Sequence, residues 1–461
     1  MLLGVSAEEA SVMLRRGELT VSVFGLGKMG LPLALVFADK GANVIGVDVS
    51  SERVEQVNRG VNPFPWEPLV SELLDNALRK GRFRATTDGV SAVKESDLVI
   101  IIVPVVAGSQ GIDLSAMNEA MKCVGRGLRK GMIVVTETTL PPGTTESYIP
   151  LLEKLSGLRV GKDFGLAHAP ERTMSGRVVK DITESYPKVI GAINKETLEP
   201  LVGVYSTINS KGVVPVSSIK VAEATKVFEG VYRDVNIALA NELALIGEEL
   251  GFNAIEAIKA ANTQPYCHIH KPGTGVGGHC IPVYPWFLIH LAGGTQRVIG
   301  VARRVNEEMP RHIALLTIKA LNKAGKPARG ARVIVLGLSY RGDVKEYMNT
   351  PSIPLVRELE EWGTRVEVED PFYAPEELRK LGLKPFNGSF KGADALVIAT
   401  DHSHYKEMDL EKIAREMRTR VLVDGRMLFL EDKRTRSFYY AAPGLGVVEP
   451  SDDKLAEHES T

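Results

Sequence analysis

Short, continuous apolar runs recur along the chain, and each is followed by a longer segment in which apolar residues return at helical spacing. In the first third of the chain, such runs cover residues 19–24, 43–48 and 97–104. Runs of this length are typical of strands buried on both faces of a parallel sheet. Because strands and helices alternate, the pattern predicts an α/β fold.

The pattern changes in the middle of the chain and then returns. Residues 219–250 keep helical spacing throughout, and Gly251 follows them, so we expect one long helix. A second parallel sheet is predicted by further apolar runs, at residues 331–336, 365–370, 393–400 and 420–424. The fold class is therefore α/β, with two Rossmann-like parallel-sheet domains joined by a long central helix in a helical middle domain.

A chain of 461 residues is too long for a single hydrophobic core. We expect an N-terminal extension (1–19), a dinucleotide-binding domain (20–212), a central helical domain that dimerises (213–310), a second Rossmann-like domain for the substrate (311–446) and a polar tail (447–461).

Charge and composition exclude several classes of protein. Lys and Arg number 56 against 57 Asp and Glu, so nothing favours nucleic acid as the partner. No apolar run approaches the roughly 20 residues of a membrane helix, and the first residues carry charges where a signal peptide is apolar. Cys123, Cys267 and Cys280 form neither a disulfide framework nor a zinc pattern. We expect no metal, no membrane and a reducing cytoplasm.

A glycine motif follows the first apolar run, and an acid ends the second. In G-x-G-x-x-G, the first glycine permits a tight turn, the second lets backbone approach a pyrophosphate, and the third lets helix and strand pack closely. The acid accepts from ribose hydroxyls and favours NAD, a preference that a nearby Arg weakens. The candidate cofactor-binding residues are Gly25, Gly27, Lys28, Met29, Gly30, Asp48, Arg53, Pro104 and Thr138.

Polar residues follow two further strands of the first sheet. Thr138 and Thr139 end one of them, at the carboxyl edge where ligands of open α/β sheets bind. Alternatively, these threonines cap a helix near Thr144. Glu171 and Arg172 follow the next strand. Glu171 is a candidate acid, base or water-positioning group, and a surface salt bridge is the alternative for both.

Two residues of the middle segment are candidates for chemistry. Lys226 lies on the apolar stripe of the long helix, where a lysine can act as a base or oxyanion clamp; a surface lysine is the alternative. Cys280 ends a glycine loop and follows His279. A thiol in such a loop is suited to nucleophilic chemistry, although many lone cysteines are inert core residues.

The second sheet opens with a strand and Gly337, but we expect its turn to lack the second and third glycines of the motif, and Ser339 stands two residues after Gly337. Arg341 and Lys345 follow, and basic side chains there suit a diphosphate or a carboxylate. Residues 401–405 end a later strand and form either a polar loop or a ligand contact.

Taken together, the chain resembles the UDP-glucose/GDP-mannose dehydrogenase family from about residue 20 to about residue 438. The resemblance rests on the runs GLGKMG, TETTLPPGTT, AHAPERTMSGR, AEATKVFEGVYRDVNIALANELALIGEELG, PGTGVGGHCIPVYPWF and DHSHY. Within the family, GGHC, YRDVNIALANEL and DHS are most similar to the members that oxidise UDP-N-acetyl-D-mannosamine. Members that act on UDP-N-acetyl-D-glucosamine are the second choice.

The resemblance implies oxidation of C6 from alcohol to carboxylate with two NAD, through a cysteine thiohemiacetal and thioester, in a homodimer. Cys280 would be the nucleophile and Lys226 the base or oxyanion stabiliser, while Thr139 and Glu171 position water. The residues implied in binding the sugar nucleotide are Arg172, Lys226, Gly273, Gly275, Gly277, Gly278, Tyr284, Arg341 and Lys345.

Four positions depart from the family pattern. Gly230 stands where the family often has Asn, and Tyr284 where it often has Asp. Met348 replaces a usual Arg, and another expected Arg is replaced around Tyr266. Because the usual water-activating pair is missing, His279 becomes a candidate base.

Two other functions fit parts of the sequence. A two-electron β-hydroxyacid dehydrogenase shares the glycine motif and a lysine on a long helix, but lacks the cysteine loop and the third domain. A non-catalytic sugar-nucleotide sensor would explain the departures from the family pattern.

Overall fold

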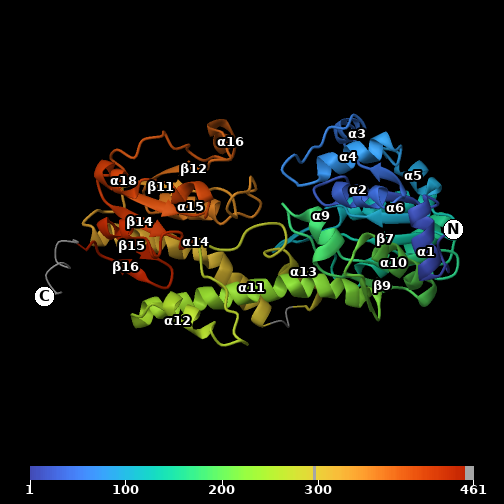
Figure 1. Cartoon of the computed structure of the whole chain (residues 1–461). Helices are drawn as coiled ribbons and strands as arrows, with labels where there is room; N and C mark the ends of the chain where they lie inside the picture. Colours follow the sequence, from blue (N-terminus) through green and yellow to red (C-terminus); the bar gives the residue numbers. More distant parts are fainter. Residues whose placement is uncertain (294–296, 452–461) are drawn as a thin grey trace. The chain divides into compact units, whose positions relative to one another are not determined.

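A computed structural model of the protein describes residues 1–293 and 297–451. The chain divides into two compact units. Unit 1 comprises Met1–Glu229 and Trp286–Leu291, and unit 2 comprises Gly230–Pro285 and Ala292–Thr461. Each unit is described by itself. The predicted fold class is confirmed, because each unit contains a mainly parallel sheet and a long helix carries residues of both (Figure 1).

Unit 1 is built on an eight-stranded sheet in the order β10-β9-β8-β7-β4-β1-β2-β3. Its neighbouring strands run parallel except for β8 and β9. The strands are β1 (Thr20–Phe24), β2 (Asn43–Val47), β3 (Phe83–Thr86), β4 (Leu98–Ile101), β7 (Ile133–Thr136), β8 (Gly165–His168), β9 (Lys188–Ala192) and β10 (Val213–Val216), and a separate hairpin consists of β5 (Val106–Gly108) and β6 (Gly111–Asp113).

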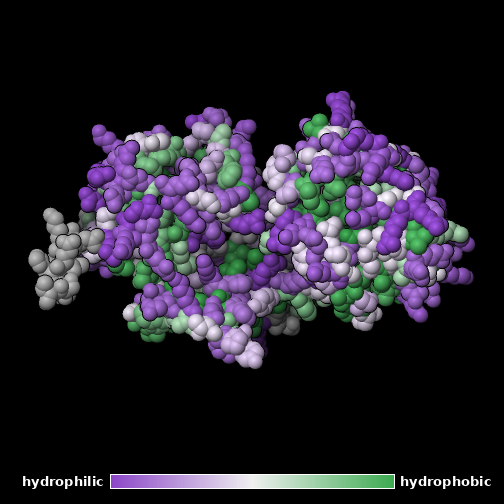
Figure 2. Space-filling view, in the orientation of Figure 1, coloured by the Kyte–Doolittle hydropathy of each residue, from purple (hydrophilic) through white to green (hydrophobic). Residues whose placement is uncertain are grey.

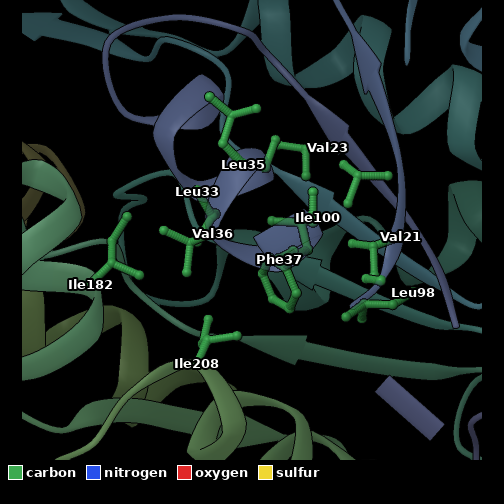
Figure 3. Close-up of a cluster of buried hydrophobic side chains, with 14 of the residues drawn as sticks. Val21, Val23, Leu33, Leu35, Val36, Phe37, Leu98, Ile100, Ile182 and Ile208 are labelled. Carbon is green, nitrogen blue, oxygen red and sulfur yellow. The ribbon is translucent and has the colours of Figure 1, made fainter. Parts of the chain in front are cut away.

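The core of unit 1 lies between this sheet and its helices. Figure 3 shows apolar side chains of α2 packed beside those of β1 and β4. The helices are α1 (Ala7–Arg16), α2 (Gly30–Asp39), α3 (Ser51–Asn58), α4 (Val70–Arg79), α5 (Gly89–Glu95), α6 (Ser115–Gly127), α7 (Thr144–Ser147), α8 (Ile149–Ser156), α9 (Val178–Lys180) and α10 (Lys195–Ile208), and a π-helical turn covers Asp181–Ser185.

The first residues of the chain belong to this core. Leu2 and Leu14 are fully buried in it, and the Leu2 amide donates to the Gly131 carbonyl over 2.9 Å. Helix α1 lies against α10 so closely that a Cβ on Gly203 would be 1.9 Å from the Ala7 carbonyl oxygen. The segment before β1 therefore contributes to the packing of unit 1.

Unit 2 contains a six-stranded sheet in the order β12-β11-β13-β14-β15-β16, in which only β16 runs antiparallel to its neighbour. Its strands are β11 (Arg332–Leu336), β12 (Arg365–Glu369), β13 (Ala395–Ile398), β14 (Val421–Asp424), β15 (Tyr439–Ala442) and β16 (Gly446–Val448). Its helices are α12 (Ala254–Ala261), α14 (Val298–Lys323), α15 (Ser352–Glu361), α16 (Pro375–Lys380), α17 (Ser403–Lys406) and α18 (Leu410–Glu416), with a 3-10 turn at Lys433–Ser437.

Two helices carry residues of both units. Helix α11 runs from Ile219 to Leu250, the bounds that the apolar periodicity predicts, and is the long green helix of Figure 1. Helix α13 (Tyr284–Leu291) is the second.

Figure 2 shows hydrophilic side chains over most of the face drawn, in both units. Within residues 1–293 and 297–451, no helix combines the length and apolarity needed to cross a membrane.

Candidate functional site

The glycine motif forms the turn between β1 and α2. Gly25 has φ 96°, and a Cβ there would lie 2.6 Å from the Ile102 carbonyl oxygen. A Cβ on Gly30 would lie 1.9 Å from the Gly25 carbonyl oxygen. These two glycines are therefore required by the fold itself. Gly27 is different, because a Cβ there would have no heavy atom of the described chain within 4 Å.

The exposed Gly27 is flanked by groups that suit a dinucleotide. Helix α2 begins at Gly30, so backbone amides at its start face the turn, where a pyrophosphate binds well. The Asp48 carboxylate accepts from the Leu26 amide over 2.9 Å and from the Ser50 amide over 2.9 Å. These residues fit NAD, since open space lies above Gly27 and an acid stands beside it.

Two basic residues accompany this turn. Arg53 donates to the Leu26 carbonyl at 3.5 Å, and its guanidinium lies 4.7 Å from the centre of the Phe64 ring. Lys28 is half-buried; burial lowers its pKa, and the nearby carboxylate of Glu67 acts in the opposite direction. Glu67 is itself buried and accepts from the Gly176 amide at 2.6 Å. No sequence motif indicates Glu67, which stands in a loop.

The hydroxyl of Thr138 does not cap a helix. Thr138 donates its hydroxyl to the Val103 carbonyl over 2.8 Å, which ties it to the segment after β4. The amides at the start of α7 are instead bound by Glu223 of α11, which accepts from Gly143 at 2.5 Å and from Thr145 at 2.7 Å. The capping alternative for Thr138 is therefore wrong. Thr139 is half-buried next to it, and Pro104 is exposed beyond the end of β4.

Glu171 lies on a turn that a buried acid supports. Its amide donates to the Glu137 carbonyl at 3.0 Å, and its carboxylate accepts from the Thr173 amide. The Glu137 side chain is fully buried between Lys188 and Tyr205, each at 2.5 Å. Burial raises the pKa of Glu137 and the nearby Glu171 adds to this, while Lys188 counteracts it. The turn therefore rests on a charged network inside unit 1.

The same turn touches the glycine motif. Thr173 donates its hydroxyl to the Met29 sulfur at 3.1 Å, so Glu171 and Arg172 lie near the motif. The Arg172 guanidinium pairs with Glu229 at 3.3 Å and lies 4.9 Å from the centre of the Tyr186 ring. The alternative of a salt bridge is therefore correct for Arg172. Among the residues that the structure describes, Glu171 forms no ion pair.

Lys226 lies on the part of α11 that belongs to unit 1. Its side chain is only 4% exposed, so the surface alternative is wrong. A buried ammonium group is costly unless it is compensated, and its retention on an apolar helix face is typical of a functional lysine.

Cys280 lies in unit 2, just before α13. It is a free, half-buried thiol, and its carbonyl accepts from the Tyr284 amide over 2.9 Å. The Tyr284 hydroxyl donates to the Cys280 sulfur over 3.0 Å. The Tyr284 ring lies against Gly230 of α11, where a Cβ would be 2.5 Å from the ring. Two of the four departures from the family pattern are therefore in direct contact.

His279 faces another group. Its side chain is 54% exposed, and Nε2 lies 3.8 Å from the Glu346 carboxylate. The same carboxylate accepts from the Tyr340 hydroxyl over 3.1 Å. Burial raises the pKa of Tyr340; Arg341 lowers it, and the nearby Cys280 raises it further.

The glycines of the loop before Cys280 are closely packed. A Cβ on Gly277 would be 2.5 Å from the Tyr340 side chain, and one on Gly275 would be 3.0 Å from Pro351. The Gly273 amide donates to Asn241 over 2.9 Å. Asn241 belongs to a buried polar network in unit 2, whose other members are Asp234, Arg303 and Asn306. Burial raises the pKa of Asp234 to about 6, against the effect of Arg303.

The candidate substrate-binding residues of the second sheet differ in their exposure and in their partners. Lys345 is exposed and pairs with Glu377 at 2.7 Å. Arg341 is half-buried beside Tyr340. His402 is fully buried and donates or accepts at Asp370 over 3.0 Å, while its other nitrogen lies 3.0 Å from the Asp343 amide. Residues 401–405 were expected to form either a polar loop or a ligand contact. Because both ring nitrogens of His402 bind groups of unit 2, His402 has a structural role in this loop.

The structure thus gathers two sets of candidate residues. Unit 1 brings the glycine motif, Asp48 and Arg53 to one turn and connects that turn to the segment of Glu171. Unit 2 places Cys280 beside Tyr284 and packs the glycine loop on residues 340–351. The sequence missed Glu67, Glu137 and Glu223. Glu137 stands in the run TETTLPPGTT, and Glu223 is an acid on the apolar stripe of the long helix.

A parallel sheet with an open second glycine and an acid after the next strand is typical of the NAD-binding domain of a dehydrogenase. Residues 19–209 match the NAD binding domain of the UDP-glucose/GDP-mannose dehydrogenase family, residues 220–308 its central domain, and residues 334–431 its UDP binding domain. The chain belongs to this family, which confirms the resemblance and the NAD cofactor.

Relatives of known name cover most of the chain. It is 38% identical to a UDP-N-acetyl-D-mannosamine dehydrogenase of Pyrococcus horikoshii over 89% of this chain and 96% of the relative. It is 35% identical to a UDP-N-acetyl-D-glucosamine 6-dehydrogenase of Pseudomonas aeruginosa over 90% of this chain and 98% of that protein. A solved structure of a UDP-D-ManNAc dehydrogenase from Pyrococcus horikoshii superposes with a TM-score of 0.84 at 37% identity, covering 93% of this chain and 100% of that one.

Proposed function

We propose that this enzyme oxidises C6 of a UDP-N-acetylhexosamine from alcohol to carboxylate, with UDP-N-acetyl-D-mannosamine as the first candidate substrate. The name of the Pyrococcus horikoshii relative supports mannosamine. UDP-N-acetyl-D-glucosamine is the second candidate, because the Pseudomonas aeruginosa relative carries that name. The two sugars differ only in configuration at C2, so incubation with each UDP-sugar and analysis of the uronate formed decides between them.

The observation that carries the proposal is the free thiol of Cys280 on a glycine loop, in a chain with an NAD-binding turn. A two-electron alcohol dehydrogenase needs no thiol. A four-electron enzyme must hold the aldehyde between its two oxidations, and a covalent bond to sulfur does this. NAD, when bound, supplies the acceptor for the hydride lost from C6 in each oxidation.

The residues of the chain then have distinct tasks. Lys226 takes the proton of the C6 hydroxyl or stabilises the oxyanion. The Cys280 thiolate attacks the aldehyde, and the new C–S bond holds C6 as a thiohemiacetal. After the second oxidation C6 is a thioester, and water positioned by Thr139 and Glu171 breaks the C–S bond. The balanced result is one carboxylate, two NADH and three protons from one alcohol, two NAD⁺ and one water.

The proposal is tested by counting NADH. We expect two NADH for each UDP-sugar consumed, and Cys280→Ser should stop uronate formation. Cys123→Ser is the matched control: burial raises the pKa of the Cys123 thiol, which lowers its thiolate fraction, so this variant should retain activity. One NADH per sugar, or undiminished uronate from Cys280→Ser, contradicts the proposal.

For the substrate, we propose that the second sheet binds the diphosphate. Arg341 and Lys345 supply the charge, with Lys345 exchanging Glu377 for phosphate. Gly273, Gly275, Gly277 and Gly278 of unit 2 are further proposed substrate-binding residues, and so is Arg172 of unit 1. The dinucleotide-binding (20–212), central (213–310) and substrate (311–446) boundaries remain our proposed division of the chain. We also propose a reducing compartment, since the reaction requires Cys280 as a free thiol.

We propose a homodimer formed along α11. Apolar side chains are exposed on this helix at spacings of seven and four residues, which places them in one stripe. They are Val221, Phe228, Tyr232, Leu239, Ile246 and Leu250. Leu239→Asp should convert a dimer to a monomer in light scattering, and a wild-type chain that is monomeric at micromolar concentration contradicts the proposal.

A further inference from the structure

The contact between Tyr284 and Cys280 joins two residues one helical turn apart. The Tyr284 amide donates to the Cys280 carbonyl over 2.9 Å, and the Val283 amide donates to the same oxygen over 3.0 Å. Residues four apart on such a turn share one face. The Tyr284 hydroxyl reaches the Cys280 sulfur over 3.0 Å and donates to it. The backbone therefore aligns the phenol with the thiol.

The position of the phenol is fixed from a second side by Gly230. A Cβ on Gly230 would lie 2.5 Å from Cδ2 of the Tyr284 ring, 3.2 Å from Cγ and 3.3 Å from Cβ. Any larger side chain at position 230 would push the ring aside. Tyr284 is only 7% exposed, so the ring cannot yield toward solvent without losing its packing. Gly230 and Tyr284 thus form one structural unit that aims a hydroxyl at sulfur.

We propose that Tyr284 is a catalytic residue that stabilises the anionic sulfur of Cys280, and that Gly230 is the positioning residue that makes room for its ring. The proposal rests on the proposed function of Cys280. Sulfur carries negative charge before it attacks the aldehyde and again when the C–S bond of the thioester breaks. A hydrogen bond donated to a charged atom favours the charged form.

The proposed step needs no additional reactant. Tyr284 keeps its proton throughout and only donates a hydrogen bond. When water adds to the thioester and the C–S bond breaks, the bonding electron pair leaves on Cys280 sulfur, next to the Tyr284 hydroxyl. The neighbouring phenol of Tyr340 does not compete for this task, because its hydroxyl donates to Glu346 over 3.1 Å.

Tyr284→Phe tests the proposal, since it removes the hydroxyl and keeps the ring against Gly230. We expect iodoacetamide at pH 7 to alkylate Cys280 about 3- to 10-fold more slowly, followed by peptide mass spectrometry. Turnover with the UDP-sugar should fall about 10- to 100-fold, as on removal of other single donors to a developing charge. Acid-quenched enzyme should accumulate the covalent adduct of Cys280 in intact-protein mass spectrometry.

Tyr440→Phe is the matched control. Tyr440 is also a buried phenol of unit 2, and its hydroxyl donates to Asp424 over 3.0 Å. This variant should alkylate and turn over like wild type. Gly230→Ala should displace the ring and reproduce the slow alkylation, and Gly230→Ala/Tyr284→Phe should be no slower than Tyr284→Phe alone, because both changes disable one contact.

The outcomes separate this inference from the proposed function. If wild type forms two NADH per sugar but Tyr284→Phe alkylates and turns over like wild type, the role of Tyr284 is overturned. If Gly230→Ala has no effect on alkylation, the role of Gly230 is overturned. If wild type forms no uronate, the proposed function fails, and the alkylation rates still decide whether Tyr284 activates Cys280.

Discussion

The two parallel sheets of this protein open in the same way and then diverge. In unit 1, β1 leads into Gly25 with φ 96°, and in unit 2, β11 leads into Gly337 with φ 107°. The residue directly after each next strand is an acid, and its carboxylate accepts from the amide after that glycine. Asp48 accepts from Leu26 at 2.9 Å, and Asp370 from Leu338 at 2.8 Å.

The divergence begins at the middle glycine. In unit 1 this is Gly27, above which space is open, and α2 begins three residues later. In unit 2, Ser339 takes the place of this glycine, and its amide also donates to Asp370 at 2.9 Å. The next helix, α15, begins only at Ser352.

The acid of the second sheet is also occupied on its remaining side. His402 lies 3.0 Å from Asp370, and Asp370 is only 3% exposed, so a ribose has no access to it. Hence the first glycine and the acid serve chain reversal in both sheets, whereas ligand binding depends on the middle glycine and on a free side of the acid.

The largest effects are expected from exchanging the glycines for alanine. A Cβ on Gly337 would lie 2.3 Å from the Thr400 side chain at a positive φ, so Gly337→Ala should destabilise unit 2 by about 3 kcal/mol. Gly27→Ala should leave the melting temperature unchanged and raise KM for NAD about 10- to 100-fold, because the methyl fills the space of the pyrophosphate. Thermal unfolding of both variants measures the loss of stability, and NAD titration of Gly27→Ala measures the loss of binding. Loss of stability in Gly27→Ala would show that this glycine, too, serves the fold.

The two acids should respond differently to loss of charge. Asp370→Asn weakens hydrogen bonds from three amides and from His402, and should lower the free energy of unfolding by about 2 kcal/mol. Asp48→Asn weakens hydrogen bonds from two amides at a half-buried site and should lower the free energy of unfolding by only about 1 kcal/mol. It should also weaken NAD binding about 10-fold, since it loses a charged acceptor for ribose hydroxyls. Denaturant unfolding and NAD titration of both variants measure these effects. Equal losses of unfolding free energy in Asp370→Asn and Asp48→Asn would contradict the comparison of the two acids.

A buried histidine makes unit 1 sensitive to acid. His168 of unit 1 bonds to Thr136 at 2.8 Å, and burial, with a smaller effect of Lys188, lowers its pKa from 6.5 to about 3. The unfolded chain binds the proton first as the pH falls, so unit 1 should lose about 2 kcal/mol between pH 7.5 and 5. Hydrogen exchange of β7 and β8 should show this loss in wild type and a smaller one in His168→Gln. Equal pH dependence in the two proteins would refute the role of His168.

Much of the fold follows from local sequence. The bounds of α11 were predictable because its apolar spacing is unbroken, and Gly25, Gly27, Gly30 and Asp48 carry the nucleotide turn in their spacing alone. The expectation that the second sheet lacks the third glycine of the motif is wrong. Gly342 stands five residues after Gly337, as Gly30 does after Gly25, and a Cβ there would lie 2.4 Å from the Asp401 carbonyl oxygen.

Other parts of the candidate site depend on residues far apart in sequence. Glu223 binds amides about 80 residues earlier in the chain, and no local pattern announces such a bond. Gly230 and Tyr284 looked like two separate losses from the family pattern. In the structure they are one exchange, in which a missing side chain on α11 makes room for a ring that reaches Cys280.

By itself, the sequence determined that this protein has two parallel sheets, a long helix, an NAD-binding turn and a thiol on a glycine loop, because hydrophobic periodicity and glycine spacing act over short stretches of chain. Only the tertiary structure decided which glycine is open to a ligand, which acid is already satisfied and which group touches the sulfur. Those properties depend on the atoms that occupy the surrounding space, and distant segments supply them.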